Sequence, residues 1–250
     1  MVKGFHSKIL INCDMGESDV LPMDQEDKDV FPFIHMASVA CGGHASNPTL
    51  LLETIRLAKQ YQVKVGAHPS YPDRENFGRK SVSLSADTLY AEILFQISSV
   101  LGICQSESIS MEYIKPHGAL YHDMQKDLSI FEVILNTLCA LDSRIFLVVP
   151  AFTLSHEHQH AAKERGIHLI YEAFADRRYT ETGHLKSRQH ADAVLNTPED
   201  IIHQARQIAQ YGTVISDQGH EIQLAADTLC FHGDNPASVS ALKQLKKDLV

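Results

Sequence analysis

Acidic, basic and histidine side chains gather just after the short apolar runs of this sequence. Such side chains transfer protons, bind anions and ligate metals. The groups are Asp14 and Glu17; Cys41 and His44; His68, Asp73 and Arg74; Lys115 and His117; Glu172, Asp176 and Arg177; and His232 and Asp234. Because the active sites of parallel barrels lie at the carboxyl ends of their strands, this placement predicts one polar pocket.

Single members of these groups also have structural interpretations. Any one histidine can be a hydrogen-bonded core residue, and acidic residues such as Asp14, Glu17 and Asp234 can cap the next segment. Cys13, Cys41 and Cys230 are expected to pack as small apolar residues near the sheet. The shared placement of the groups therefore carries the prediction of a site.

A divalent metal at this pocket is an open alternative. The residues with suitable types for zinc or manganese are Asp14, His44, His68, His117 and His232. No local ligand spacing accompanies them, and the same groups can serve as acids and bases without a metal. The tract His156-Glu157-His158-Gln159-His160 is predicted to be solvated surface at the start of an outer helix. Gly78-Arg79-Lys80-Ser81 is no phosphate-binding loop, since Asp73 stands where its opening glycine belongs.

The elements that position these groups alternate between strand and helix. Predicted strands are 9–12, 37–40, 63–67, 111–115, 145–149, 167–171 and 228–231. Helices are predicted to begin after Asn47, Ser85, Thr197 and Asn235, the second ending at Gly102, and an apolar stripe runs over 130–141. Seven such units favour one α/β domain over 1–250, a (β/α) barrel with a hairpin insertion near 213–224. An open parallel sheet is the alternative.

Composition narrows the classes of function. The chain has 250 residues, 44% of them hydrophobic. Its formal net charge of −9 argues against nucleic acid as a partner, because phosphates repel a negatively charged protein. Its apolar runs are shorter than a secretory segment or a bilayer span requires, so no membrane association is expected. The five cysteines are widely spaced and contain no CxxC, which is typical of a reduced cytoplasmic protein.

Seven blocks of the sequence resemble the lactam-utilisation (LamB/YcsF) family. They are 11–18 (INCDMGES), 40–45 (ACGGHA), 66–73 (GAHPSYPD), 77–79 (FGR), 115–121 (KPHGALY), 172–179 (EAFADRRY) and 230–236 (CFHGDNP). The blocks follow the family order over essentially the whole chain. One departure is Gly43, where the family usually carries an aromatic residue, and this substitution is expected to alter the pocket near His44.

The resemblance implies a barrel of the glycoside hydrolase/deacetylase type and one subunit of an enzyme. The implied reaction converts 5-oxo-L-proline, ATP and water to L-glutamate, ADP and phosphate with separate B and C subunits. Assembly of this chain into a homo-oligomer is a further open alternative. ATP is thus expected as a co-substrate of the complex. Two alternatives are a metal-dependent amidohydrolase or deacetylase that acts alone and a non-catalytic subunit that binds the lactam.

The same resemblance and the chemistry of lactam opening suggest roles for twelve residues. Such a reaction needs a base for water, an acid for the leaving nitrogen and cations for the substrate. The candidate catalytic residues are Asp14, Glu17, His44, His68, His117 and Asp176. The candidate substrate-binding residues are Lys115, Arg177, Asp73, Arg79, His232 and Asp234. Asp14 or Glu17 is expected to be the base.

Overall fold

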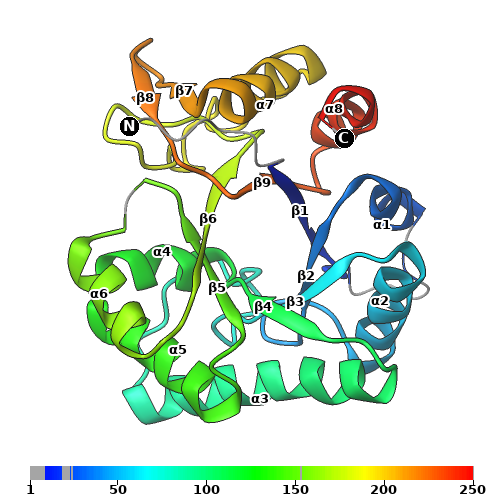
Figure 1. Ribbon diagram of the computed structural model, residues 1–250, viewed down its shortest axis with the longest axis vertical. Coiled ribbons are helices and arrows are strands. Elements are labelled where there is room, and N and C mark those ends of the chain that lie inside the picture. Colours follow the sequence, from blue (N-terminus) through cyan, green and yellow to red (C-terminus); the bar gives the residue numbers. More distant parts are fainter. Residues whose placement is uncertain (1–8, 19–22, 24, 153, 250) are drawn as a thin grey trace.

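The computed structural model describes residues 9–18, 23, 25–152 and 154–249. Within these ranges seven parallel strands close into a barrel, because β9 pairs with both β1 and β6 (Figure 1). The barrel strands are β1 (Leu10–Met15), β2 (Met36–Ala40), β3 (Lys64–His68), β4 (Met111–Ile114), β5 (Phe146–Pro150), β6 (Leu169–Phe174) and β9 (Thr228–Phe231). The predicted (β/α) barrel is confirmed, and the open sheet is excluded.

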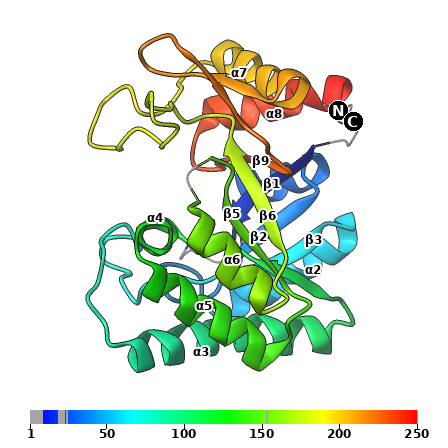
Figure 2. The same cartoon turned by 60° about the vertical axis from the view of Figure 1, so that its left-hand side comes forward.

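Helices cover the outside of the barrel. They are α1 (Gln25–Val30), the 3-10 turn η1 (Phe31–Phe33), α2 (Pro48–Tyr61), α3 (Ala86–Ser106), α4 (Gly118–Lys126), α5 (Leu128–Leu141), α6 (His156–Glu164), α7 (Pro198–Tyr211) and α8 (Pro236–Leu249). Side chains of Asn47, Ser85 and Thr197 accept hydrogen bonds from the first turns of α2, α3 and α7, as their positions predict. Figure 2 shows α7 and α8 packed together at one end of the molecule.

The predicted end of α3 at Gly102 is wrong, since the helix continues to Ser106. One glycine inside a helix costs only about 1 kcal/mol relative to alanine. Cys104, which is fully buried, extends the apolar face of the helix beyond the glycine. Packing against the barrel therefore outweighs the local preference of Gly102.

A two-stranded hairpin precedes the last barrel strand. Its antiparallel strands are β7 (Thr213–Ile215) and β8 (Glu221–Gln223), which confirms the insertion predicted near 213–224. An isolated bridge joins Ser216, next to β7, to Tyr179 in the loop that follows β6. The insertion thus contacts the long loop beside the barrel mouth.

Alternation along the strands divides the core into two layers. Outward residues such as Ile11, Val39 and Leu147 pack under the helices, whereas Met36, Tyr113 and Val148 form a small apolar cluster inside the barrel. Gly66 is required for this cluster, because a Cβ there would lie 2.3 Å from the Tyr113 ring. Above the apolar layer the interior becomes polar.

Helix α3 is long and apolar enough to cross a bilayer by length and composition alone. One such helix is weak evidence for a membrane span, since core helices of soluble proteins pass the same test. The face that carries Leu89, Ile93 and Ile97 is buried in the barrel core.

Candidate active site at the carboxyl ends of the strands

A cavity of about 440 Å³ opens at the carboxyl ends of the barrel strands. Nine of the twelve predicted residues line it: Asp14, Glu17, His68, Arg79, Lys115, His117, Arg177, His232 and Asp234. His44 and Asp176 lie behind this lining, and each contacts a residue that belongs to it. Residues far apart in the chain are therefore brought to one concave surface, as the placement at strand ends predicts.

Asp73 is the predicted residue that the structure places elsewhere. Its Oδ1 accepts hydrogen bonds from the backbone N of Asn76 at 3.2 Å and from the side-chain Nδ2 at 2.7 Å. Asp73 therefore stabilises the turn that leads to Phe77 and Gly78, and it is not among the residues that line the cavity. This position does not support a contact between Asp73 and a substrate.

Lys115 lies at the floor of the cavity and is almost completely buried. Its Nζ is 2.9 Å from Asp14 Oδ1 and 2.8 Å from Glu172 Oε1. The same ammonium donates to Asn12 Oδ1 at 3.1 Å. Burial alone would lower the pKa of Lys115, but Asp14, Cys230 and Glu172 raise it well above its usual value. The lysine therefore stays charged and holds two carboxylates at the barrel mouth.

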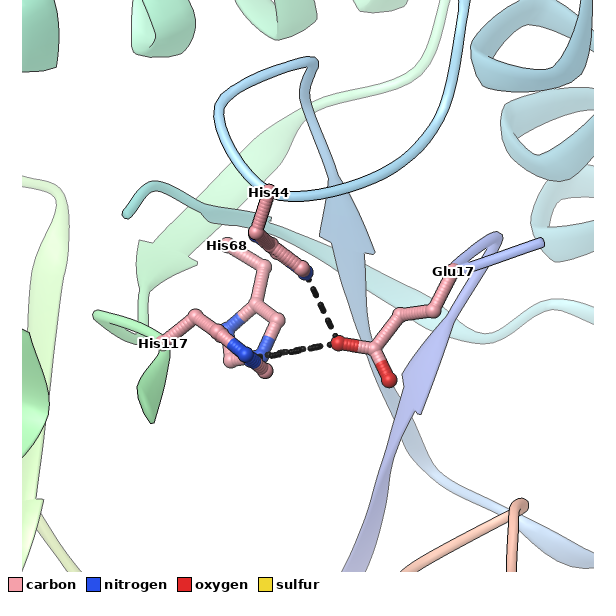
Figure 3. Close-up of side chains that lie close together, drawn as sticks. All are labelled: Glu17, His44, His68 and His117. Atoms are coloured by element: carbon pink, nitrogen blue, oxygen red, sulfur yellow. Dashed lines mark hydrogen bonds and ion pairs between the residues drawn. The ribbon is translucent and has the colours of Figure 1, made fainter. Parts of the chain in front are cut away.

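Three histidines surround the carboxylate of Glu17, which lies in the loop after β1 (Figure 3). Glu17 Oε1 lies 2.9 Å from His44 Nε2, 3.2 Å from His117 Nδ1 and 3.7 Å from His68 Nε2. His44 follows β2, His68 ends β3 and His117 follows β4. Successive strands thus supply one histidine each to the same point.

Electrostatics fix the charges in this cluster. Burial raises the pKa of a carboxyl, but His68 and Lys115 hold the pKa of Asp14 well below its usual range. Hydrogen bonds from His117 and His44 likewise overcome burial and lower the pKa of Glu17. Burial would lower the pKa of His68, yet Asp14 raises it, whereas burial lowers the pKa of His44 to about 4. At neutral pH both carboxylates are therefore ionised and His44 is neutral.

A second unit, in the segments that follow β6 and β9, pairs His232 with Asp176. His232 Nδ1 is 2.8 Å from Asp176 Oδ1, and the His232 backbone N donates to Asp176 Oδ2 at 3.1 Å. Burial opposes ionisation of Asp176, but His232 lowers the pKa of this carboxyl. Phe174 stacks on the imidazole with ring centroids 5.8 Å apart. The imidazole of His232 is thus held from two sides.

Basic residues give the cavity a cationic rim. Arg177 donates to the carbonyl of Lys186 at 2.7 Å, and burial together with Arg188 lowers its pKa to about 10. Arg79 and Asp234 form an exposed ion pair of 3.3 Å at the cavity edge. Lys186 and Arg188 also line the cavity. This rim favours an anionic ligand.

Several residues of the site carry no role in the sequence-based prediction. Glu172 lies at a predicted strand end, and Tyr121 donates to its Oε2 at 2.8 Å. Asn12, His122 and Arg188 also belong to the network or the lining. Glu172 and Tyr121 lie within sequence blocks that resemble the family, and position in those blocks is the signal that could identify them. Arg188 lies in a loop outside those blocks, where the family commonly carries a Pro-Arg pair and this chain has Ser187-Arg188.

Gly43, which stands where the family usually carries an aromatic residue, lies close to Gln96 and Ser70. A Cβ at this position would lie 2.5 Å from both Gln96 Oε1 and Ser70 Oγ. Gln96 also pairs with the backbone of Ser70 in both directions, at 3.0 and 2.9 Å. The volume beside Gly43 is therefore filled by Gln96 of α3, and Gly43 itself does not line the cavity.

Two groups of described residues bring metal-ligand atoms within 4.8 Å of one another. One contains Glu17, His44, His68 and His117, and the other contains Asp14, Cys230 and His232. The five metal ligands predicted from residue type are thus divided between these two groups. The structure adds Glu17 to the first group and Cys230 to the second.

Fold and site together define a parallel (β/α) barrel whose polar, partly cationic site occupies the position used by barrel enzymes. The LamB/YcsF family model matches residues 9–250, and the chain belongs to the LamB/YcsF family.

Relatives support this membership over nearly full lengths. The chain is 42% identical to a protein of Vibrio cholerae serotype O1 that is named as the A subunit of 5-oxoprolinase, over 96% of this chain and 97% of the relative. It is 41% identical to a second protein with this name, the 5-oxoprolinase A subunit 2 of Pseudomonas putida, over 97% and 94%. The crystal structure of a lactam utilization protein from Thermus thermophilus superposes with a TM-score of 0.87 at 33% identity, over 96% and 97%.

Proposed function

We propose that this chain is the A subunit of an ATP-dependent 5-oxoprolinase of the cytoplasm. In this function one domain, residues 1–250, opens the ring of 5-oxo-L-proline to L-glutamate together with B and C subunits. The names of relatives at 42% and 41% identity support the proposal. One ATP and two waters are consumed, one water for the opened amide and one for the released phosphate, and ADP and phosphate are formed.

The observation that carries the proposal is the buried Lys115 between the carboxyl groups of Asp14 and Glu172, beneath a cationic rim. Lys115 Nζ lies 2.9 Å from Asp14 and 2.8 Å from Glu172, and Arg177 lines the same cavity. A five-membered lactam with one carboxylate is small enough for about 440 Å³. Its carboxylate, or a phosphoryl group on its carbonyl oxygen, matches the guanidinium groups of Arg177 and Arg79.

Asp14 is the proposed base for the attacking water. The carboxylate is ionised at neutral pH because His68 and Lys115 lower its pKa. An anionic substrate beside Lys115 weakens this ion pair and increases the basicity of Asp14. Glu17 and His68 flank Asp14, and His44 and His117 hold Glu17 in place. Water attack on the activated carbon then forms the new C–O bond.

His232 is the proposed acid for the leaving ring nitrogen. Asp176 fixes the imidazole through Nδ1, so that Nε2 is the nitrogen available to the cavity. As an imidazolium, His232 gives its Nε2 proton to the nitrogen as the C–N bond breaks, which frees the amino group. The oxygen that carried the phosphoryl group is then part of an acyl phosphate, and a second water releases phosphate and leaves L-glutamate. Asp234, which pairs with Arg79, is proposed to keep that guanidinium at the cavity edge.

Reconstitution tests the proposal. Glutamate formation from 5-oxoproline with ATP is measured for the purified chain alone, for B and C alone, and for all three. The expected result is ATP-dependent glutamate only with all three subunits. An intact three-subunit assembly that forms no glutamate would contradict the proposal.

The metal-ligand groups at the mouth favour a second candidate, an amidohydrolase or deacetylase that acts alone with a divalent ion. Ring opening by the isolated chain, without ATP and with stoichiometric metal, would support this candidate. The third possibility, a non-catalytic lactam-binding subunit, requires saturable binding of 5-oxoproline and unchanged turnover when cavity residues are substituted.

A further inference from the structure

Backbone carbonyls fix the protonated nitrogens of His68 and His117. His68 Nδ1 lies 2.6 Å from the carbonyl oxygen of Lys115, and His117 Nε2 lies 2.9 Å from that of Phe77. Because a carbonyl oxygen only accepts, each of these nitrogens carries the hydrogen. In the neutral rings the lone pairs are therefore on His68 Nε2 and His117 Nδ1.

These two lone pairs converge on each other and on Glu17. The nitrogens are 2.9 Å apart, and Glu17 Oε1 is 3.2 Å from one and 3.7 Å from the other. Three acceptors at such distances repel one another unless a positive charge lies between them. Without a metal, a proton on His117 Nδ1 supplies this charge and donates to Glu17, whereas a proton on His68 Nε2, which also lies 3.3 Å from Asp14 Oδ2, leaves His117 Nδ1 facing the Glu17 oxygen. A metal cation contacts all three atoms at once.

The spacing of the three atoms also suits a metal. Ligands bound tetrahedrally at 2.0–2.1 Å lie about 3.3 Å from one another. The three observed separations, 2.9, 3.2 and 3.7 Å, lie on both sides of that value. Carbonyl hydrogen bonds to the opposite ring nitrogens are the usual support for metal-bound histidines.

His44 is excluded as a fourth ligand by its orientation. Its ring stacks on His117 with centroids 3.7 Å apart and an angle of 2° between the planes. A metal lies near the plane of each imidazole that binds it, and two stacked parallel planes share no such point. His44 Nε2 instead donates to Glu17 Oε1 at 2.9 Å and positions that oxygen.

We propose that Glu17 Oε1, His68 Nε2 and His117 Nδ1 bind one divalent transition-metal ion of the zinc type. Two imidazole nitrogens and one carboxylate form a ligand set that leaves one coordination position free. All three residues line the cavity, so the ion has a route of entry and the free position faces the substrate space. The inference concerns binding of the ion and does not depend on the identity of the substrate.

Zinc binding by the full chain tests the site. The protein is treated with a chelator, dialysed and titrated with Zn²⁺, and bound metal and the thermal unfolding midpoint are measured. Wild-type protein is expected to bind one equivalent and to gain thermal stability by mass action. Glu17→Gln and His117→Gln are expected to lose more than the roughly 10–100-fold in affinity that loss of a supporting hydrogen bond costs. His44→Gln, which removes only such a bond, should fall within that range.

Two controls separate the site from other ligands. The double variant His156→Gln/His160→Gln removes two exposed histidines of α6 and should bind zinc like the wild type. Cys230→Ser disrupts the second metal-ligand group and should also retain the zinc. The proposal would be overturned if the folded wild type bound no stoichiometric zinc. It would also be overturned if either control lost the zinc while Glu17→Gln kept it. Either failure leaves the ATP-dependent reaction to be judged separately by glutamate formation.

Discussion

Two groups of three histidines behave in opposite ways in this molecule. His156, His158 and His160 are neighbours in the sequence, yet His156 and His160 are exposed while His158 turns inward to Ser155 and Phe131. His44, His68 and His117 span more than seventy residues, yet their rings lie together around Glu17 (Figure 3). Proximity in the sequence therefore predicts no site here, whereas position at strand ends does.

The different arrangement of the two histidine groups follows from the geometry of helices and of parallel strands. A helix turns each residue by 100°, so alternate residues of α6 point in different directions. Parallel strands deliver their last side chains to one edge, and barrel closure aims them at one opening. Burial then supplies what the exposed tract lacks, since ion pairs at low dielectric change pKa values and fix tautomers.

Removal of Lys115 should produce the largest difference between the two regions. Lys115→Met leaves the carboxylates of Asp14 and Glu172 buried without their cation, and we expect a loss of about 3–5 kcal/mol in the free energy of unfolding. Denaturant titration measures this loss. Lys163→Met, on the exposed side of α6, is the matched control and should change stability little. Equal effects of the two variants would contradict the importance of the buried network.

Loss of the partner of His232 should lower the rate with little change in fold. Asp176→Asn removes the negative charge and one of the two oxygens that accept from His232 Nδ1 and the His232 backbone N, so kcat for glutamate formation in the complex is expected to fall by roughly 10²–10⁴. The pH profile of kcat should change as well, which a purely structural role would not cause. Asp142→Asn, at the partly exposed end of α5, should leave both unchanged. An unaltered pH profile in Asp176→Asn would count against the assignment of His232.

Buried His44 should make stability depend on pH. Its pKa is about 4 in the folded chain against about 6.5 in unfolded peptides. Between these values the unfolded state binds a proton that the folded state does not, so the free energy of unfolding decreases as pH falls from 6.5 to 4. The shift corresponds to roughly 3 kcal/mol. The free energy of unfolding is measured against pH in the presence of a chelator. His44→Asn should show a shallower decline than the wild type, and His160→Asn should show the same decline as the wild type. Equal slopes for all three proteins would refute this prediction.

Substitution in the exposed tract should have the smallest effect. His160 lies 3.3 Å from Glu164, and both side chains are largely exposed. His160→Ala should change the free energy of unfolding by at most about 0.5 kcal/mol and leave glutamate formation intact. A large loss of activity would show that α6 contributes to the reaction or to assembly of the complex, and would remove the contrast between the two histidine groups.

The sequence predicts the barrel well because its local signals agree with its packing. Apolar runs and the caps at Asn47, Ser85 and Thr197 mark the strands and the long helices. α4 carries no side-chain cap at His117 and α1 is a short charged turn, so neither has a clear start signal. The prediction of a helix end at Gly102 is wrong because the local preference of glycine takes no account of the buried packing at Cys104.

The candidate site is likewise only partly predictable from the sequence. Residue type and strand-end position predict which side chains meet at the cavity, including Lys115 and Glu17. They do not predict pairings, because the Lys115–Glu172 contact and the Asp176–His232 contact each join distant segments. The role of Asp73 in a turn depends on the local path of the chain after β3.

The most direct test of the account is glutamate formation by the three-subunit complex that carries Asp14→Asn. Asparagine keeps the size of the side chain but removes the charge that pairs with Lys115 and His68. We predict that turnover falls by roughly 10²–10⁴ while the complex still assembles and the chain remains folded. Turnover near the wild-type rate in such a complex would contradict the placement of the reaction at the barrel mouth.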